Sequence, residues 1–328
     1  MEYRDLTVKN ADGSPRGVIK VSRLCFGSLC LGHMQSDLEL REGAAVIRRA
    51  YELGVNFIDT AQSYGTYKYI KAAGPGNFII SSKTYAHTRS LAEEALEEAL
   101  HELGRDYIDI FMLHEQESIH TLEGHFEALE YLFGQKERGR IKAVGLSTHH
   151  VSGVLGAVEF NAEYKKYKHK LDVIHPIYNM PGLGISGGTL TEMEAALLEA
   201  KKSGFFIFCM KALGGGLLYN RAEEALGFVF AKPFIDCAAV GMKSRWEVEA
   251  NVQFTNTGKF PSGYYSDYNK VKKSLHIDGW CAGCGECVKK CRQGALKLAG
   301  GKSVCDAGKC LLCGYCAAVC RDFALKII

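Results

Sequence analysis

The alternation of strand-like and helix-like segments constrains the fold of this chain more than any other feature. Short apolar runs such as Phe78–Lys83 are each followed by a stretch with apolar residues at helical spacing, such as Ser90–Leu103. Eight such units follow one another along most of the chain. The strand-like runs lack clean polar alternation, which indicates burial on both faces of a parallel sheet. Eight units over about 250 residues predict an α/β fold of the closed (β/α)₈ TIM-barrel type rather than an open doubly wound sheet.

The segments on either side of the predicted barrel differ from it in pattern. Tyr3–Lys9 and Gly17–Ser22 alternate polar and apolar residues around Asp12-Gly13-Ser14-Pro15, which predicts an N-terminal β-hairpin. We expect the hairpin and barrel to span residues 1–256, a linker to span 257–278, and a small α+β domain to span 279–328. The predicted barrel strands are Leu24–Leu31, Asn56–Ala61, Phe78–Lys83, Tyr107–His114, Ile141–Thr148, Asp172–Asn179, Phe205–Leu213 and Ile235–Met242.

The composition narrows the class of protein. Of the 328 residues, 47% are hydrophobic and 23% are charged, as in globular proteins. The formal net charge of +3 is too small to indicate nucleic acid or an anionic membrane surface as a partner. The sequence has no apolar run near the roughly 20 residues of a membrane helix. Its first residues are mixed and charged, unlike a signal peptide. These features predict a soluble, cytoplasmic protein.

Four polar residues follow neighbouring strands of the predicted barrel at the point where each strand ends. Asp59 and Tyr64 come after the second strand, Lys83 ends the third, and His114 ends the fourth. Barrels of this kind carry their chemistry at the carboxyl ends of the strands. Any one of these residues alone is more often structural, but four titratable groups at three neighbouring strand ends predict an active site.

These four side chains suit the reduction of a carbonyl group. A neutral tyrosine is a poor acid near neutral pH, because its reference pKa is about 10. An ammonium within hydrogen-bond reach favours the phenolate, so Lys83 is predicted to make Tyr64 a better proton donor. Asp59 would hold Lys83 charged and oriented, and His114 would donate a hydrogen bond to the substrate oxygen. We therefore predict that Tyr64 protonates the oxygen while hydride reaches the carbon.

This set resembles the catalytic tetrad of the aldo-keto reductases. The likeness rests on Asp59-Thr60-Ala61, Tyr64-Gly65, Lys83 and Leu113-His114, and it extends over the barrel from about residue 1 to 256. It implies an NADPH-dependent oxidoreductase that acts on a small-molecule carbonyl substrate, an aldehyde, a ketone or a related compound. In this resemblance Lys243 is the cation for the adenosine 2′-phosphate, which favours NADPH over NADH.

The resemblance also implies which residues bind the dinucleotide. Three of them depart from the usual residues of the family. Thr148 stands where asparagine is common, His175 where glutamine is common, and Met210 about where an aromatic ring stacks on the nicotinamide. These departures affect the pose and affinity of the cofactor more than the fold. The implied cofactor-binding residues are Gly27, Ser28, Ser147, Thr148, His175, Met210, Lys211, Leu213, Lys243, Ser244 and Asn251.

Two runs of four cysteines dominate the last part of the chain. Each run has the spacing Cys-x-x-Cys-x-x-Cys-x-x-x-Cys, and the second repeats the first at an offset of 29 residues that also relates Lys297 to Lys326. This spacing puts three thiolates on one tight loop and the fourth at the start of a helix, which suits a cubane [4Fe–4S] cluster. Structural zinc sites pair two Cys-x-x-Cys arms across a longer gap, so zinc is the less favoured alternative.

The cysteine-rich module resembles the bacterial two-cluster ferredoxins, in which the fourth cysteine of each run binds the other cluster. The resemblance implies two [4Fe–4S] clusters in a ferredoxin-like domain behind the barrel. Arginine follows each fourth cysteine, where proline is usual. Cys305 lies outside both runs and is expected to be a free thiol. The first cluster would be held by Cys281, Cys284, Cys287 and Cys320, and the second by Cys310, Cys313, Cys316 and Cys291.

The predicted barrel and the predicted cluster domain transfer different numbers of electrons. Hydride transfer in the barrel moves two electrons, whereas each cluster passes one. No short flavin motif is present, although a barrel can hold a flavin without one, so a flavin stays open. One hypothesis is that the clusters exchange electrons with an external carrier while the barrel reduces a carbonyl. A second is that the clusters are structural or sense redox state beside an ordinary NADPH reductase. A third is an electron-transfer or partner-binding protein whose barrel is a degenerate, non-catalytic scaffold.

Overall fold

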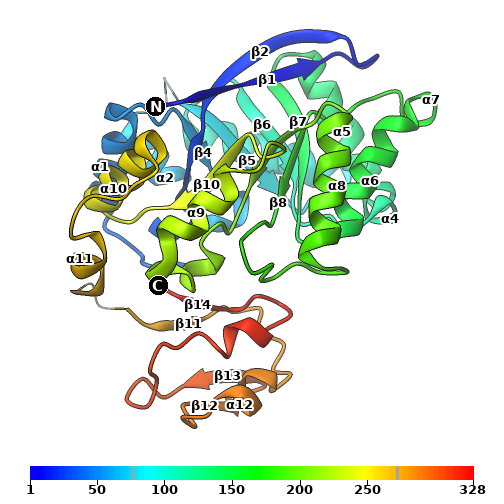
Figure 1. Ribbon diagram of the computed structural model, residues 1–328. Helices are drawn as coiled ribbons and strands as arrows, with labels where there is room; N and C mark the ends of the chain where they lie inside the picture. Colours follow the sequence, from blue (N-terminus) through cyan, green and yellow to red (C-terminus); the bar gives the residue numbers. More distant parts are fainter. Residues whose placement is uncertain (75, 77, 271–272) are drawn as a thin grey trace.

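Eight parallel strands close into a barrel in the computed structural model, which describes residues 1–74, 76, 78–270 and 273–328 (Figure 1). The strands are hydrogen-bonded in the order β10-β3-β4-β5-β6-β7-β8-β9, so chain order is kept around the barrel. The predicted (β/α)₈ barrel is confirmed. The strand bounds are β3 (Leu24–Gly27), β4 (Phe57–Asp59), β5 (Ile79–Thr84), β6 (Ile108–Leu113), β7 (Ile141–Thr148), β8 (Val173–Pro176), β9 (Phe206–Cys209) and β10 (Cys237–Gly241).

Helices form the outer layer of the barrel. The Phe57 and Phe208 rings meet inside the barrel, with centroids 5.0 Å apart, whereas Ile58 and Phe111 are buried in the cluster that includes the helices. This double burial explains why the strands lack polar alternation. Within the described ranges, none of the helices combines the length and hydropathy needed to cross a bilayer. The helix bounds are α1 (Leu40–Glu52), α2 (Tyr67–Ala73), α3 (Arg89–Leu103), α4 (Ile119–Gly124), α5 (Phe126–Glu137), α6 (Val151–Ala162), α7 (Tyr164–Tyr167), α8 (Leu190–Lys202), α9 (Ala222–Phe230) and α10 (Arg245–Thr257).

The N-terminal hairpin closes the barrel at the amino ends of its strands. β1 (Tyr3–Lys9) and β2 (Pro15–Ser22) pair antiparallel, as the turn pattern predicts. Leu6 and Val21 are buried in the same cluster as Phe57, the first residue of β4. Apolar side chains of the hairpin therefore fill the amino-terminal end of the barrel. A functional site is expected at the other end, in the loops that follow the carboxyl ends of the strands.

Most predicted strands extend beyond the observed ones by a few residues, and at the carboxyl ends two of these differences are the largest. The first barrel strand was expected over Leu24–Leu31 but ends at Gly27, after which Ser28–Leu31 form a 3₁₀ helix. The seventh strand was expected over Phe205–Leu213 but ends at Cys209, after which Gly214–Gly216 form a 3₁₀ turn. Both differences add short turns at the carboxyl ends of strands, where the predicted site lies.

The segment predicted as a linker, residues 257–278, contains a helix packed on the barrel. The Tyr264 ring of α11 (Tyr264–Lys270) lies 3.9 Å from the Phe260 ring and 5.2 Å from the Trp246 ring of α10, measured between centroids. Residues 271–272 of this segment lie outside the described part of the chain. The stacked rings hold α11 against α10, so the segment is more than a spacer.

Residues 273–328 form a small unit beneath the barrel in Figure 1, and they contain two antiparallel sheets of two strands each. β11 (Leu275–Ile277) pairs with β14 (Leu325–Ile327), and β12 (Leu296–Ala299) pairs with β13 (Lys302–Cys305), with α12 (Glu286–Lys290) between β11 and β12 in the chain. β11 lies within the segment predicted as a linker and, by pairing with the last strand, joins that segment to the unit. Its small core contains the side chains of Cys281, Cys287, Cys291, Cys305, Cys316 and Cys320.

The last strand of the chain lies against the mouth of the barrel. β14 contacts the 3₁₀ turn Gly214–Gly216, which follows β9. A Cβ atom on Gly216 would lie 2.0 Å from the Ile327 carbonyl oxygen, and one on Gly184 would lie 2.6 Å from the Phe323 ring. Such close approaches require glycine, because no side-chain carbon fits there. These glycines therefore serve the contact between the barrel and the C-terminal unit.

Replacing Gly216 by alanine is expected to loosen this contact without unfolding the barrel. Gly216 has a φ of +87°, a region that costs other residues roughly 1–3 kcal/mol, and the added methyl group would overlap the Ile327 carbonyl. Hydrogen exchange of the β14 amides should accelerate about ten-fold or more. The control is Gly227→Ala, at an open position of α9, which should leave this exchange unchanged. Equal exchange in the two variants would contradict the close approach.

Candidate active site

The carboxyl ends of β4 and β5 bring an ammonium and a carboxylate of the predicted tetrad together. Lys83 Nζ donates hydrogen bonds of 2.8 Å to the Asp59 carboxylate and of 2.8 Å to the Thr60 carbonyl oxygen. Lys83 is fully buried, and Asp59 is 5% exposed. A buried ammonium needs an opposite charge and further hydrogen-bond acceptors, and these two groups supply both.

Asp59 stays ionised because its charged neighbours outweigh its burial. Burial acts to raise the pKa of Asp59, but Lys83 and then His175 hold that pKa well below its ordinary value. His175 Nε2 lies 3.6 Å from the Asp59 carboxylate, and His175 Nδ1 lies 2.6 Å from the Phe208 carbonyl oxygen. Both ring nitrogens of His175 therefore face protein groups. The predicted contact of His175 with the nicotinamide amide would require this ring to rearrange.

Tyr64 lies beside Lys83, but the two are not joined as the sequence suggested. The Lys83 ammonium lies 5.0 Å from the centroid of the Tyr64 ring, and its hydrogen bonds within the described residues go to Asp59 and Thr60. Burial, followed by the charge of Asp59, raises the pKa of Tyr64 well above its ordinary value. The expected net lowering of the Tyr64 pKa is therefore not seen, because burial disfavours the phenolate. Tyr64 keeps its proton, which is the state that a proton donor needs.

His114 faces Tyr64 across the site. Its ring meets the Tyr64 ring edge-on, with 5.8 Å between centroids, and stacks on the Tyr85 ring at 4.4 Å. Burial, followed by the charge of Lys83, lowers the pKa of His114 well below its ordinary value, so the imidazole is neutral near pH 7. Its Nδ1 atom is buried without a hydrogen-bond partner among the described residues. A neutral imidazole can donate one hydrogen bond to a carbonyl oxygen.

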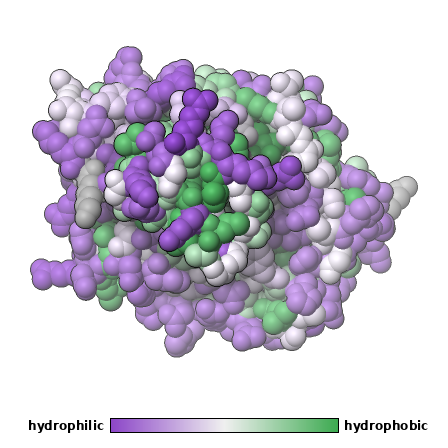
Figure 2. All heavy atoms as spheres, turned by 90° about the horizontal axis from the view of Figure 1, so that it is seen from below, coloured by the Kyte–Doolittle hydropathy of each residue, from purple (hydrophilic) through white to green (hydrophobic). Residues whose placement is uncertain are grey.

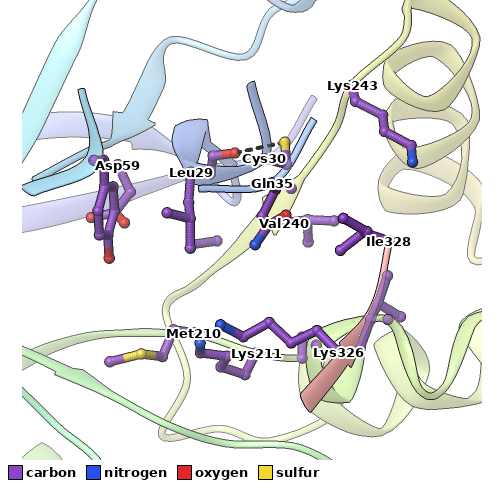
Figure 3. A pocket seen from close by; sticks show the side chains of 18 of the residues that line it. Leu29, Cys30, Gln35, Asp59, Met210, Lys211, Val240, Lys243, Lys326 and Ile328 are labelled. Atoms are coloured by element: carbon purple, nitrogen blue, oxygen red, sulfur yellow. Dashed lines mark hydrogen bonds between the residues drawn. The ribbon is translucent and has the colours of Figure 1, made fainter. Parts of the chain in front are cut away.

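A cavity of about 210 Å³ opens beside the tetrad (Figure 3). Asp59 and Lys243 lie on opposite sides of the view, and Met210 and Lys211, which follow β9, lie along another wall. Lys83 does not reach the wall, because Asp59 and Thr60 hold it in the interior. The predicted site residues that line the cavity are Gly27, Asp59, Tyr64, His114, His175, Met210, Leu213, Lys211 and Lys243.

Five predicted cofactor-binding residues do not line this cavity. Each has a polar partner in its own neighbourhood, so its side chain serves the local fold in this structure. Their contacts with a dinucleotide remain predictions. The partners are Thr66 for Ser28, the Glu115 amide for Ser147, the His150 amide for Thr148, the Glu247 amide for Ser244, and the Glu247 carbonyl oxygen for Asn251.

Sequence reasoning missed one wall of the cavity entirely. Lys326 and Ile327 of β14, the following Ile328, and Tyr268 of α11 all line it. No linear pattern places the last strand of a separate module at the mouth of a barrel. The cavity also has lining residues outside the named site residues, mainly from the barrel loops, and they include Leu29, Gln35, Ser36, Glu115, His149, Gly241 and Glu247.

Lys83→Met is expected to destabilise the protein by roughly 3–5 kcal/mol, because it leaves the buried Asp59 without its main counter-charge. The lowered pKa of Asp59 means that the ion pair stabilises the fold above the unfolded-state pKa of about 3.9, and that this stability is lost as pH falls. Without Lys83, burial raises the pKa of Asp59, so the variant can protonate this carboxylate near pH 4, and its loss of stability should be larger at pH 7 than near pH 4. Urea unfolding at both pH values measures it. Asp59→Asn/Lys83→Met, which removes both charges, should recover part of the loss; equal losses in the single and double variants would contradict the ion pair.

The predicted cluster cysteines are gathered in the C-terminal unit as free thiols. Cys284 and Cys313 are exposed, and the other six are at least partly buried. Among the described residues, no group of three or more His, Cys, Asp or Glu side chains converges as it would around one metal ion. Burial and the neighbouring thiols raise the pKa of Cys316 to about 11. Burial, followed by the neighbouring Cys310 thiol, raises the pKa of Cys305, which lies outside both runs, to about 11.

Comparison with known proteins places the barrel in a family. Residues 23–228 match the model of the aldo/keto reductase family. The chain is 26% identical over 274 residues to L-galactose dehydrogenase of Arabidopsis thaliana, covering 71% of this chain and 84% of that protein. It is 28% identical over 123 residues to methylglyoxal reductase DkgA of Salmonella typhimurium, covering 35% of this chain and 44% of that protein. The solved holo structure of the aldo-keto reductase AKR11C1 from Bacillus halodurans shares the fold, with a TM-score of 0.60, 20% identity, and coverage of 82% of this chain and 96% of that chain.

The family match spans more than half of the chain and includes the loops that carry the predicted tetrad. The chain therefore belongs to the aldo/keto reductase family. It is an NAD(P)H-dependent oxidoreductase. The match ends at residue 228, before the cysteine-rich unit.

Proposed function

We propose that the protein reduces an aldehyde, a ketone or a related carbonyl compound with NADPH at the cavity beside the tetrad. One observation carries the proposal: Asp59, Tyr64, Lys83 and His114 converge from three neighbouring strand ends next to that cavity. A methylglyoxal reductase among the relatives is consistent with this reaction class. The same convergence argues against a barrel that is only a non-catalytic scaffold. Burying the charged pair of Asp59 and Lys83 costs desolvation free energy, which a scaffold has no reason to spend.

Each residue of the tetrad has a separate role in this proposal. Tyr64, neutral and on the cavity wall, protonates the carbonyl oxygen as negative charge develops there. His114, also neutral, donates a hydrogen bond to the same oxygen and so positions the substrate. Lys83, hydrogen-bonded to Asp59 and beside the Tyr64 ring, would place its ammonium next to the phenolate that remains after the proton leaves. NADPH, when bound, supplies the hydride.

The cavity is too small to enclose a whole dinucleotide. Its volume of about 210 Å³ lies below the roughly 300–1,000 Å³ of typical ligand pockets. The remainder of the cofactor would extend along the open side towards Lys243, the proposed cation for the 2′-phosphate. Met210, on the wall, is proposed to pack on the nicotinamide ring.

Isotope transfer tests the reaction. The protein is incubated anaerobically with NADPH carrying deuterium at the transferred position of C4, together with a panel of aldehydes and ketones. We expect deuterium on the carbinol carbon of the product, and a lower KM for NADPH than for NADH because of Lys243. Oxidation of NADPH without deuterium in the product would contradict direct hydride transfer and would favour single-electron chemistry through the C-terminal unit.

We also propose that residues 279–328 form a ferredoxin-like domain with two [4Fe–4S] clusters, that residues 1–256 form the barrel domain, and that residues 257–278 connect them. The donor set fits: all the candidate ligands are free thiols, and a cubane cluster spaces its thiolates further apart than a single ion does. The Ser303 and Ala324 amides face the Cys281 and Cys320 sulfurs at 3.5 and 3.3 Å, as hydrogen bonds to cluster sulfurs do. The clusters, when bound, would pass single electrons. The proposed ligands are Cys281, Cys284, Cys287 and Cys320 for one cluster, and Cys310, Cys313, Cys316 and Cys291 for the other.

An external electron carrier is the proposed redox partner of these clusters. Figure 2 shows hydrophobic side chains gathered at the centre of the lower face of the molecule. Leu311 and Tyr315, within the second cysteine run, are 68% and 63% exposed. Exposed apolar groups beside a cluster suit brief docking of a carrier. A flavin could split the electron pair of NADPH, but no residue of the chain is assigned to bind one, and it is not part of this proposal.

Reduction of the clusters by NADPH separates the two remaining hypotheses. NADPH is added anaerobically, and the EPR spectrum is recorded before and after. A reduced-cluster signal would support electron exchange between the barrel and the clusters. A silent spectrum in a protein that transfers deuterium would support a structural or sensing role.

A further inference from the structure

We propose that Lys326 of the C-terminal unit and Lys211 of the barrel together bind an anionic group in the cavity, and that this group is the diphosphate of the dinucleotide. The inference rests on the proposed function. It goes further, because it makes cofactor binding depend on the docked cysteine-rich unit as well as on the barrel.

The two lysines come from distant parts of the chain and meet on one wall. Lys211 follows β9 and Lys326 lies in β14, and Figure 3 shows both side chains along the same side of the cavity. Lys211 Nζ lies 4.9 Å from the centroid of the Phe323 ring. A Cβ atom on Gly215 would lie 2.9 Å from Phe323 and 3.2 Å from Lys326. The pair is therefore created by the docking of the C-terminal unit on the glycine turn.

Among the described residues, Asp278 alone forms an ion pair with either lysine, and Glu115 adds a more distant negative charge that acts on both. Lys326 is 2% exposed, and its ammonium contacts the Asp278 carboxylate, which also faces His276. Lys211 lies over the Phe323 ring, and among the described residues no carboxylate is within ion-pair distance of it. Burial, followed by the charge of Lys326, lowers the pKa of Lys211 to about 7. An anion between the two ammonium groups would restore the charge of Lys211.

The internal repeat offers a comparison within the same chain. Lys297 of β12 stands 29 residues before Lys326 of β14, at the same position of the repeat. Lys297 is exposed, whereas Lys326 is buried on the cavity wall. Burying an ammonium group costs free energy. At the equivalent position of the first repeat, Lys297 is exposed and does not incur this cost. The burial of Lys326 therefore reflects its place at the barrel mouth and not a need of the repeat.

The position of Lys211 and Lys326 favours the diphosphate of the cofactor, rather than an anionic group of the substrate, as their ligand. In Figure 3, Asp59 of the tetrad and Lys243 lie on opposite sides, and Lys211 and Lys326 lie between them along the lower wall. A dinucleotide with its nicotinamide at the tetrad and its 2′-phosphate at Lys243 has its diphosphate between the two ends. His149 Nε2, on the same cavity, is buried without a hydrogen-bond partner among the described residues and offers one further polar contact.

The affinity of the intact, iron-containing protein for NADPH tests the inference. Lys211→Met and Lys326→Met should each raise the Kd for NADPH about ten-fold or more, because each removes a charged partner of a phosphate. Lys297→Met is the matched control and should keep the wild-type Kd. Asp278→Asn/Lys326→Met removes both members of the buried ion pair, and it keeps the test valid if Lys326→Met alone folds poorly. Inorganic pyrophosphate should compete with NADPH in wild type and much less in Lys211→Met.

The outcomes distinguish a cofactor diphosphate from an anionic group of the substrate. They also distinguish failure of this inference from failure of the proposed function. Wild-type Kd values combined with a raised KM for a carboxylate-bearing aldehyde would assign the anion to the substrate and overturn the diphosphate assignment. Wild-type Kd and KM values in every variant would overturn the site altogether. A wild-type protein that binds NADPH but transfers no hydride would refute the proposed function while leaving this site standing. A wild-type protein that binds no NADPH would refute both.

Discussion

Tyr64→Phe is expected to lower kcat for carbonyl reduction by roughly 10²–10⁴-fold and to leave the Kd for NADPH unchanged. The substitution removes only the hydroxyl group, so the ring keeps its edge-on contact with His114 and its place beside the Lys83 ammonium. The proton is needed as the substrate oxygen becomes negative, so the loss should fall on kcat and kcat/KM together. Steady-state kinetics with an aldehyde and fluorescence titration with NADPH measure the two quantities.

Tyr85→Phe is the matched control for this experiment. The Tyr85 hydroxyl bonds the Glu115 carboxylate at 2.8 Å, and its ring stacks on His114, a contact that phenylalanine retains. Activity within a few-fold of wild type is expected. Should Tyr64→Phe also retain more than a tenth of the wild-type kcat, Tyr64 would not be the proton donor, and His114 would be the next candidate.

Cys284→Ala and Cys313→Ala are each expected to remove about half of the iron, from about eight to about four atoms per chain. These two cysteines occupy equivalent positions of the repeat, and both are exposed, so alanine costs little packing. Loss of iron should therefore report ligation. Because metal binding stabilises small modules, the C-terminal unit should also become more sensitive to protease while the barrel persists. Iron analysis and EPR of the reduced protein provide the measurements.

Cys305→Ala is the control for the cysteine variants. Cys305 lies outside both runs and is expected to keep the full iron content, although its thiol lies beside Cys310. Loss of iron in this variant would move Cys305 into the ligand set and would remove one of the eight assigned cysteines. Zinc in place of iron in the purified wild-type protein would overturn the cluster proposal itself.

The barrel and its chemistry could be predicted from local pattern to a large extent. Apolar runs followed by helical spacing depend only on neighbours in the chain, so the eight units and their order were predicted before any contact was known. The site was harder, because its contacts depend on side-chain geometry. The sequence placed Lys83 near Tyr64, but the hydrogen bonds of Lys83 go to Asp59 and Thr60, and burial raises the pKa of Tyr64 instead of lowering it.

The sequence by itself determined the barrel, the four residues at its strand ends and the two repeated cysteine runs. Each of these features depends only on the spacing of residues within a continuous part of the chain. Only the tertiary structure decided that β14 lies at the barrel mouth and that Lys326 shares a cavity wall with Lys211. The reason is that this wall depends on the close approach of Gly216 to Ile327, two residues from modules with separate local patterns. Spacing within either module carries no information about how their surfaces meet.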